Sequence, residues 1–421
     1  MHMVLRTLTI LVFTLCLACQ AEEAKEQIKY SKELLEKAEK GDAEAQLKLA
    51  TCYGEGLGVP KDKKIAFEWV KKSADQGYKR AILTQARCYL FGWGVPWDEE
   101  KAKPIFQEAE SGQVRAQNDL GNYFSGKYER TEKKDPQKAI MWWEKAANQG
   151  YEWAQLNLAK AYAEGLEGKK DYQKSFVFFQ KAAAQNNYEA VLELGICYRE
   201  GRGVPQDLIE AKKWFEKSAQ QNNPVGLASL GEFYERGRGD TPVDLQKAGE
   251  LYKKAADQNY TWAQERLGYL YSDGMGVERD PGKAFEMFQK ASDLGSTSAQ
   301  LALGMLYYNG KIPENKTPYD PRKPSYRKKD FQKAFEWTLK SAEGGCKDAQ
   351  YNVAILYWRG DGTEVDLEKA RLWMGKVAEG GDPNAKKVLK WITANQNIDK
   401  IIDGWFSFGD KSKKESPTNP Q

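Results

Sequence analysis

Histidine is nearly absent from this sequence of 421 residues, since the only one is His2. Because His2 lies in a segment that has the character of an export signal, the processed protein would contain no imidazole, the side chain that titrates nearest neutral pH. This lack excludes nucleophilic triads and proton shuttles that use histidine, and every zinc site with a histidine ligand. An excess of one charge is also lacking, since 64 Lys and Arg stand against 60 Asp and Glu. We therefore expect no nucleic-acid partner.

Closely spaced cysteines are lacking outside the N-terminus. No CxxC motif occurs among the downstream cysteines, so a zinc knuckle or a thioredoxin-like site is unsupported. We expect no metal and no cofactor. The six cysteines are Cys16, Cys19, Cys52, Cys88, Cys197 and Cys346.

The N-terminus has the features of an export signal. Arg6 precedes an apolar run over residues 8–18, which is too short to span a bilayer comfortably. Two processing routes remain open. The sequence Leu-Ala-Cys-Gln ending at Gln20 resembles a bacterial lipobox and would lipidate Cys19, whereas ordinary signal cleavage would discard both Cys16 and Cys19. The predicted location is the periplasm or the outer membrane, with the membrane contacted only through a lipid at Cys19, and secretion is the alternative.

The rest of the chain repeats itself with a period near 36 residues. Successive units open 35 to 38 residues apart, except for one spacing of 50. Most units have leucine four residues after the opening position, alanine or glycine after five and an aromatic residue after eight. These offsets share one stripe of a helix, so each unit is predicted to begin with an amphipathic helix A. The opening residues are Ala45, Ala81, Ala116, Ala154, Ala190, Gly226, Ala263, Ala299, Ala349 and Ala385.

A turn and a second helix complete each unit. In the first unit the turn is Gly-Leu-Gly-Val, beginning at Gly56, and Asp62 follows in a position suited to cap the next helix. Helix B then has the pattern Lys-Ala-x-x-aromatic-aromatic-x-Lys-Ala-Ala, as in residues 138–147, with its apolar residues on one face. The small residue of helix A lets another helix approach closely.

Stacking of these units is required, because one helix pair cannot bury its own apolar stripe. The fold class predicted is all-α, a right-handed α-solenoid superhelix of helix-turn-helix repeats of about 36 residues. We expect a signal peptide over residues 1–20, a tether and capping helix over 21–41, and nine units with a partial tenth over 42–393. A loop is inserted at residues 311–330, and residues 394–421 form a C-terminal cap and a disordered tail.

The combination of the Ala-x-x-x-Leu-Gly-x-x-Tyr helix, the Gly-x-Gly-Val turn and the Lys-Ala helix resembles the Sel1-like repeat family, a relative of the tetratricopeptide repeat. The resemblance implies an adaptor that assembles other proteins, and exported bacterial members are similar to envelope scaffolds or host-contact factors. A cysteine-rich secreted branch has paired cysteines and is associated with penicillin binding or β-lactamase activity. This chain lacks that pairing.

Partner-binding residues are expected where the repeat pattern leaves helix A free. By analogy with tetratricopeptide arrays, the concave face takes the offsets −1, +2, +6, +9 and +10 from the opening residue. Arginine and aromatic residues, which are frequent in interface hot spots, occupy many of these positions. The predicted groove residues are Arg80, Arg87, Arg115, Trp153, Lys160, Arg199, Trp262, Tyr269, Met305, Tyr308, Trp358 and Arg359.

The inserted loop offers a second candidate surface. Its four prolines forbid a continuous helix, and its basic residues could engage an acidic partner, although a solvated insertion without function is the alternative. The loop candidates are Tyr319, Arg322, Tyr326, Arg327 and Lys328.

The function predicted is a noncatalytic scaffold of the bacterial cell envelope that binds a protein or peptide in its groove. The alternatives are an enzyme of cell-wall or β-lactam chemistry and a secreted host-interaction factor. Ser325 and Lys328 match the Ser-x-x-Lys motif of serine β-lactamases, but the motif's usual partner sequences are missing. The Gly-x-Gly turns follow helices rather than strands, which argues against nucleotide binding.

Overall fold

The computed structural model describes residues 29–126, 134–166, 168–310 and 329–394, and the regular structure within these ranges is helical throughout. This confirms the predicted all-α repeat solenoid. None of the helices in the described ranges is long and apolar enough to cross a membrane.

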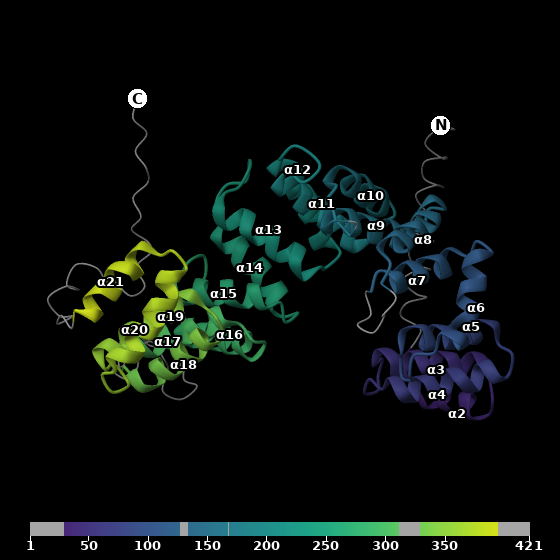
Figure 1. Ribbon diagram of the computed structural model, residues 1–421, viewed down its shortest axis with the longest axis horizontal. Coiled ribbons are helices and arrows are strands. Elements are labelled where there is room, and N and C mark those ends of the chain that lie inside the picture. The colour runs from purple at the N-terminus through teal and green to yellow at the C-terminus, as the bar shows by residue number, and fades with distance from the viewer. Residues whose placement is uncertain (1–28, 127–133, 167, 311–328, 395–421) are drawn as a thin grey trace. The chain divides into compact units, whose positions relative to one another are not determined.

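Among the described residues nine helix pairs follow one another in chain order, and successive helices within a compact unit lie side by side (Figure 1). Helix α2 (Lys32–Glu39) precedes the pairs and α21 (Pro383–Thr393) follows them, at the two places where the repeat pattern predicted helices. The A and B helices are α3 (Ala43–Glu55) with α4 (Lys63–Asp75), α5 (Lys79–Phe91) with α6 (Glu99–Glu110), α7 (Val114–Phe124) with α8 (Pro136–Asn148), α9 (Glu152–Glu164) with α10 (Tyr172–Ala184), α11 (Tyr188–Glu200) with α12 (Leu208–Gln220), α13 (Pro224–Arg236) with α14 (Leu245–Ala256), α15 (Thr261–Asp273) with α16 (Pro281–Asp293), α17 (Thr297–Tyr308) with α18 (Phe331–Glu343), and α19 (Lys347–Arg359) with α20 (Leu367–Glu379).

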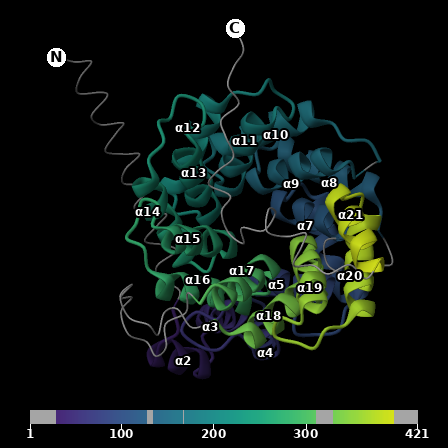
Figure 2. The same cartoon turned by 90° about the vertical axis from the view of Figure 1, so that its left-hand side faces the viewer.

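The chain divides into two compact units. The first comprises residues 1–194 and 202–204, and the second comprises residues 195–201 and 205–421. Within each unit a helix packs mainly against the helices before and after it in the sequence. Figure 2 shows this at the end of the second unit, where α20 and α21 lie side by side. The inserted loop falls between α17 and α18, and its residues 311–328 lie outside the described ranges.

The turn between helix A and helix B is held by the same backbone bond in each pair. In the third pair Asp135 caps α8 by accepting a bond from the Lys138 backbone N–H, while its own N–H donates to the Phe124 carbonyl oxygen at 2.8 Å. Lys138 Nζ lies 3.3 Å from the Asp135 carboxylate and 5.4 Å from the centre of the Phe124 ring. The bond from the capping aspartate to the helix A aromatic recurs in the pairs Asp62–Tyr53, Asp98–Tyr89, Asp171–Tyr162, Asp207–Tyr198, Asp244–Tyr234, Asp280–Tyr271, Asp330–Tyr307 and Asp366–Tyr357.

These caps predict a loss of stability in acid. Bonds from backbone N–H groups, chiefly that of Lys138 or Lys369, hold the pKa of Asp135 and of Asp366 below the ordinary value. Since the pKa is lower in the folded chain, the stabilisation is complete above the unfolded pKa of about 3.9 and is lost as the pH falls through the lower folded value. Thermal melting between about pH 7 and pH 2 measures the loss. Asp366→Asn keeps a capping side chain that does not titrate, so its melting temperature should fall less in acid than the wild type's. Equal acid losses in the two proteins would contradict this role for Asp366.

Close helix packing explains the small residue of helix A. A Cβ atom at Gly121 would overlap the indole ring of Trp143, which is buried on α8. In the second unit a Cβ atom at Gly268 would lie 2.7 Å from the buried ring of Phe288. The aromatic residue of helix B therefore fills the space that the missing side chain leaves.

Three cysteines occupy one position of helix A. Cys52, Cys88 and Cys197 are buried and Cys346 is partly exposed, and none of these four described cysteines is in a disulfide. Burial raises the pKa of Cys88 to about 11, so little of its reactive thiolate exists at neutral pH. In a chain that begins after Cys19, we expect a maleimide to modify Cys346 under native conditions and the other three only in denaturant. Mass spectrometry of the folded protein checks the order, and prompt labelling of Cys88 would contradict it.

Candidate functional site

Two hollows open along the A helices of the first unit. The arginine hollow has a volume of about 350 Å³ and is formed by α3, α5, α6 and α7 with the turn before α7. The asparagine hollow has a volume of about 280 Å³ and is formed by α7, α9 and the start of α11 with Tyr151. Helix α7 contributes to both, so the hollows adjoin along one helix.

The arginine hollow brings together three of the predicted groove residues. Arg80, Arg87 and Arg115 line it over an apolar floor that includes Leu83 and Ile105. Arg80 and Arg115 are exposed and make no ion pair within the described part of the chain. The hollow therefore offers two guanidinium groups to a ligand.

The third arginine is engaged by the protein. Arg87 Nε lies 2.5 Å from a carboxylate oxygen of Asp119 on α7. Burial raises the pKa of Asp119, while the charge and hydrogen bond of Arg87 act in the opposite direction. Glu108 also lines the hollow and is paired with Lys79 at 3.6 Å. The local charge remains positive because neither acid forms an ion pair with Arg80 or Arg115, although the charge of Arg115 also acts on Asp119.

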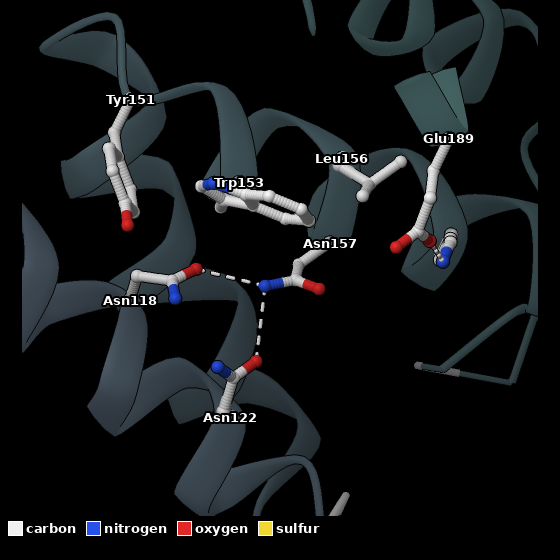
Figure 3. A pocket seen from close by; sticks show the side chains of 8 residues that line it. Asn118, Asn122, Tyr151, Trp153, Leu156, Asn157 and Glu189 are labelled. Carbon is white, nitrogen blue, oxygen red and sulfur yellow. Dashed lines mark hydrogen bonds and ion pairs between the residues drawn. The ribbon is translucent and has the colours of Figure 1, made fainter. Parts of the chain in front are cut away.

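The asparagine hollow is built around three buried amides. Asn118, Asn122 and Asn157 are 7%, 6% and 9% exposed. Asn157 Nδ2 donates to Asn118 Oδ1 at 2.9 Å and to Asn122 Oδ1 at 3.1 Å, and Figure 3 shows the Asn157 side chain directed toward the other two. Both hydrogens of Asn157 Nδ2 are thereby used. The Nδ2 groups of Asn118 and Asn122 and the Oδ1 of Asn157 have no hydrogen-bond partner within the described residues.

The walls of the asparagine hollow are aromatic and charged. Trp153 lines it and makes an edge contact with Tyr188, with 6.1 Å between ring centres. Lys160 on α9 forms an ion pair with Glu189 on α11, and both residues line the hollow. The structure thus brings the predicted Trp153 and Lys160 into one site, but the charge of Lys160 is compensated.

The charges of the arginine hollow also influence a residue of the asparagine hollow. Tyr151 lines the asparagine hollow, and burial raises its pKa. The positive charges of Arg115 and Arg87 oppose that rise, and Arg115 is the stronger of the two. The charges that act on Tyr151 thus include those of two residues that line the arginine hollow.

The predicted groove residues of the second unit are largely engaged within the protein. Arg199 is paired with Glu200 at 2.8 Å, and Tyr269 makes an edge contact with the buried ring of Phe288. Three of the four others that remain partly exposed also contact neighbouring helices or loops, and the fourth is half-buried. Trp262 contacts Tyr252, Tyr308 donates a hydrogen bond to Asp361 at 3.1 Å, Arg359 contacts the Tyr308 hydroxyl, and Met305 is half-buried on α17.

The prediction for Trp358 is wrong. This side chain is 6% exposed and belongs to a core cluster drawn from α18, α19, α20 and α21, which includes Val388 and Ile392 of α21. The residue at offset +9 lies near the end of helix A, where its side chain is close to the helix A of the next repeat. Glu235 has the same offset and is paired with Arg266 of the following helix A, α15. At this position helix A therefore packs against the neighbouring repeat.

The remaining candidates cannot be placed. Cys19 and the loop candidates Tyr319, Arg322, Tyr326, Arg327 and Lys328 lie outside the described residues, as does Ser325. Within the described ranges no three His, Cys, Asp or Glu side chains gather in a way that could hold a metal ion.

Sequence reasoning missed the asparagines although it had the signal for them. Asn118 and Asn122 stand at offsets +2 and +6 from Ala116, both of which were assigned to the free face. Asparagine is not among the residue types that are enriched in interface hot spots, so composition alone does not single these positions out. Asn157 stands at offset +3, and only its contacts with the other two reveal its place.

The sequence matches a model of the Sel1 repeat in ten segments. Two of these, residues 297–323 and 325–346, contain α17 and α18, so they are the halves of one helix pair separated by the insertion. The segments are residues 43–78, 86–109, 114–151, 154–187, 189–223, 224–260, 263–296, 297–323, 325–346 and 347–382.

Two solved structures are similar over most of the chain. One is c5321, a protective antigen of uropathogenic Escherichia coli strains with an SLR fold, at 29% identity and a TM-score of 0.50, covering 85% of this chain and 81% of that one. The other is a Sel1 repeat protein from Oxalobacter formigenes, at 26% identity and a TM-score of 0.51, covering 86% of this chain and 89% of that one. A search of curated proteins gave no match.

Proposed function

The chain belongs to the Sel1 repeat family, whose members generally serve in protein–protein interaction, and from this premise we propose that it is a noncatalytic scaffold of the bacterial cell envelope. Its partner is a protein segment that binds along the A helices of the first unit. The observation that carries the proposal is the pair of adjoining hollows, which hold two unpaired arginines and three buried amides with unused hydrogen-bonding groups. Because the repeat pattern does not need these groups for packing, they are available to a ligand.

Export to the envelope is supported by two observations. The apolar run over residues 8–18 after Arg6 has the length of a signal-peptide core. The sequence Leu-Ala-Cys-Gln ending at Gln20, which resembles a lipobox, is a second signal of export. Fractionation of native cells tests the anchor, since a Cys19→Ser variant should leave the membrane fraction if Cys19 carries a lipid.

Photo-crosslinking in native cells tests the scaffold. A benzoylphenylalanine placed at Trp153 lies in the asparagine hollow, and the same residue at Met141, 40% exposed on α8, serves as the control. We expect a discrete protein adduct from position 153 and none from position 141. Adducts of equal yield at both positions, or none at either, would contradict a binding role for the hollow.

A catalytic alternative is tested separately. If the chain acted on β-lactams through Ser325, a chromogenic β-lactam would be turned over by the wild type and not by a Ser325→Ala variant. We expect no turnover by either protein.

A further inference from the structure

The unused polar groups of the asparagine hollow define the chemistry of its ligand. Asn118 and Asn122 each present an N–H donor, and Asn157 presents a carbonyl acceptor, all on residues that are at least nine-tenths buried. None of these atoms is among the buried polar atoms without a partner, so each reaches the open hollow. A ligand that displaces water from the hollow must therefore supply both an acceptor and a donor. A peptide main chain supplies one of each at every residue. The hollow therefore suits an extended backbone better than it suits a charged small molecule.

The arginine hollow adds a requirement for negative charge. Arg80 and Arg115 carry no ion pair within the described ranges, and they stand over the apolar side chains of Leu83 and Ile105. A guanidinium group binds a carboxylate through two parallel hydrogen bonds. Glu108 is already paired with Lys79, so it competes weakly for these arginines.

Resting on the proposed function, we propose that the first unit binds an extended acidic peptide segment of its partner. The peptide main chain lies against Asn118, Asn122 and Asn157, and an aspartate or glutamate side chain of the same segment reaches Arg80 and Arg115. Helix α7 carries residues of both hollows, so one segment can contact them together. With helices about 10 Å apart, the face from α3 to α11 is about 40 Å long, which matches about twelve extended residues.

The probe is a phage-displayed library of random peptides of about twelve residues, selected on the immobilised wild-type protein. Peptides enriched on the wild type should carry more Asp and Glu than the starting library. The strongest of them, made synthetically, should bind more weakly as salt concentration rises. Selection of neutral or basic peptides, or no enrichment over an Arg80→Ala, Arg115→Ala double variant, overturns the proposal.

Matched variants separate the asparagines from the rest of the fold. Asn118→Asp keeps the oxygen that accepts from Asn157 but loses the donor that faces the hollow, and we expect the synthetic peptide to bind about tenfold or more weakly. Asn148→Asp makes the same charge change on the exposed end of α8 and should leave binding unchanged. Methylating single backbone nitrogens of the peptide should weaken binding at the residues that face Asn157 and nowhere else. Circular dichroism melting confirms that the variants are folded.

Different results would contradict the scaffold function and the acidic-peptide inference. Crosslinks from position 153 together with peptides that ignore Asn118→Asp would overturn the acidic-peptide inference and leave the scaffold standing. Recovery of a glycan or a nucleotide in place of a peptide would overturn the inference as well. Absence of any crosslinked protein in native cells would overturn the scaffold.

Discussion

Replacing Gly121 by alanine is expected to lower the stability of the first unit by about 1–2 kcal/mol, although alanine is the better helix former. The added Cβ atom would overlap Cδ1 of the buried Trp143 indole, so the ring or the helix would have to shift. Overpacking of this kind costs about 1–3 kcal/mol, whereas alanine gains up to about 1 kcal/mol over glycine inside a helix. Urea unfolding followed by tryptophan fluorescence measures the difference.

Gly54→Ala is the matched control for Gly121→Ala. Gly54 also lies in an A helix of the first unit, but a Cβ atom there would meet only the Ala66 side chain at an ordinary 3.7 Å. We expect this variant to be more stable than the wild type by about 0.5–1 kcal/mol. If both variants gained stability, the account of the glycine as a space for the helix B aromatic would fail. Because Asn118 and Asn122 share α7 with Gly121, peptide binding should weaken in Gly121→Ala alone.

Removing Glu235 is expected to destabilise the second unit by about 3 kcal/mol. Tyr252, which is fully buried on α14, donates a hydrogen bond to Glu235 at 2.6 Å, and Arg266 on α15 is paired with the same carboxylate. Glu235→Ala leaves both groups without this partner. Burial, with the neighbouring Glu235, raises the pKa of Tyr252, so its hydroxyl remains a donor at neutral pH.

Two further variants separate the contributions at Glu235. Glu235→Gln keeps an oxygen for the Tyr252 hydroxyl but removes the charge, so it should lose less stability than Glu235→Ala. Glu368→Ala removes a carboxylate that is 84% exposed and paired with Arg371 on the surface of α20, and we expect little change. Thermal and urea unfolding of the four proteins, with wild type as reference, checks the order. A loss in Glu368→Ala as large as that in Glu235→Ala would contradict the assignment.

Much of the fold was readable from the sequence because its rules repeat. The cap at Asp62, the glycine turn at Gly56 and the aromatic at Tyr53 each stand at a fixed offset, and each performs the same task in the structure. The role of the lysine at Lys138 was not predicted. A lysine in an exposed first turn has many solvated conformations, and only the folded turn shows it between the Asp135 carboxylate and the Phe124 ring.

The candidate site was harder to predict from the sequence. Helical offsets indicate which way a side chain points, but they do not show whether a neighbouring helix buries it. The offsets selected Arg80 and Arg115, which line a hollow, but they also assigned Trp358 to the free face, although it is buried in a core cluster with residues of α21. The asparagines were not predicted, although they line a hollow. Asn157 donates to the other two asparagines and leaves their amide nitrogens without a partner among the described residues. Only the structure shows which hydrogen-bonding groups remain unused, because the three side chains come together only in the folded chain.

Packing between sequence neighbours gives this chain an unusual relation between binding and mechanical strength. Each helix of the first unit is held mainly by the helices next to it, so every interface between repeats is a place where the stack can part. A peptide that spans α5, α7 and α9 would cross several of these interfaces at once. At a free peptide concentration [L], it would add RT ln(1 + [L]/Kd) to the free energy of unfolding of the repeats that it contacts. It would also raise the force needed to pull those repeats apart.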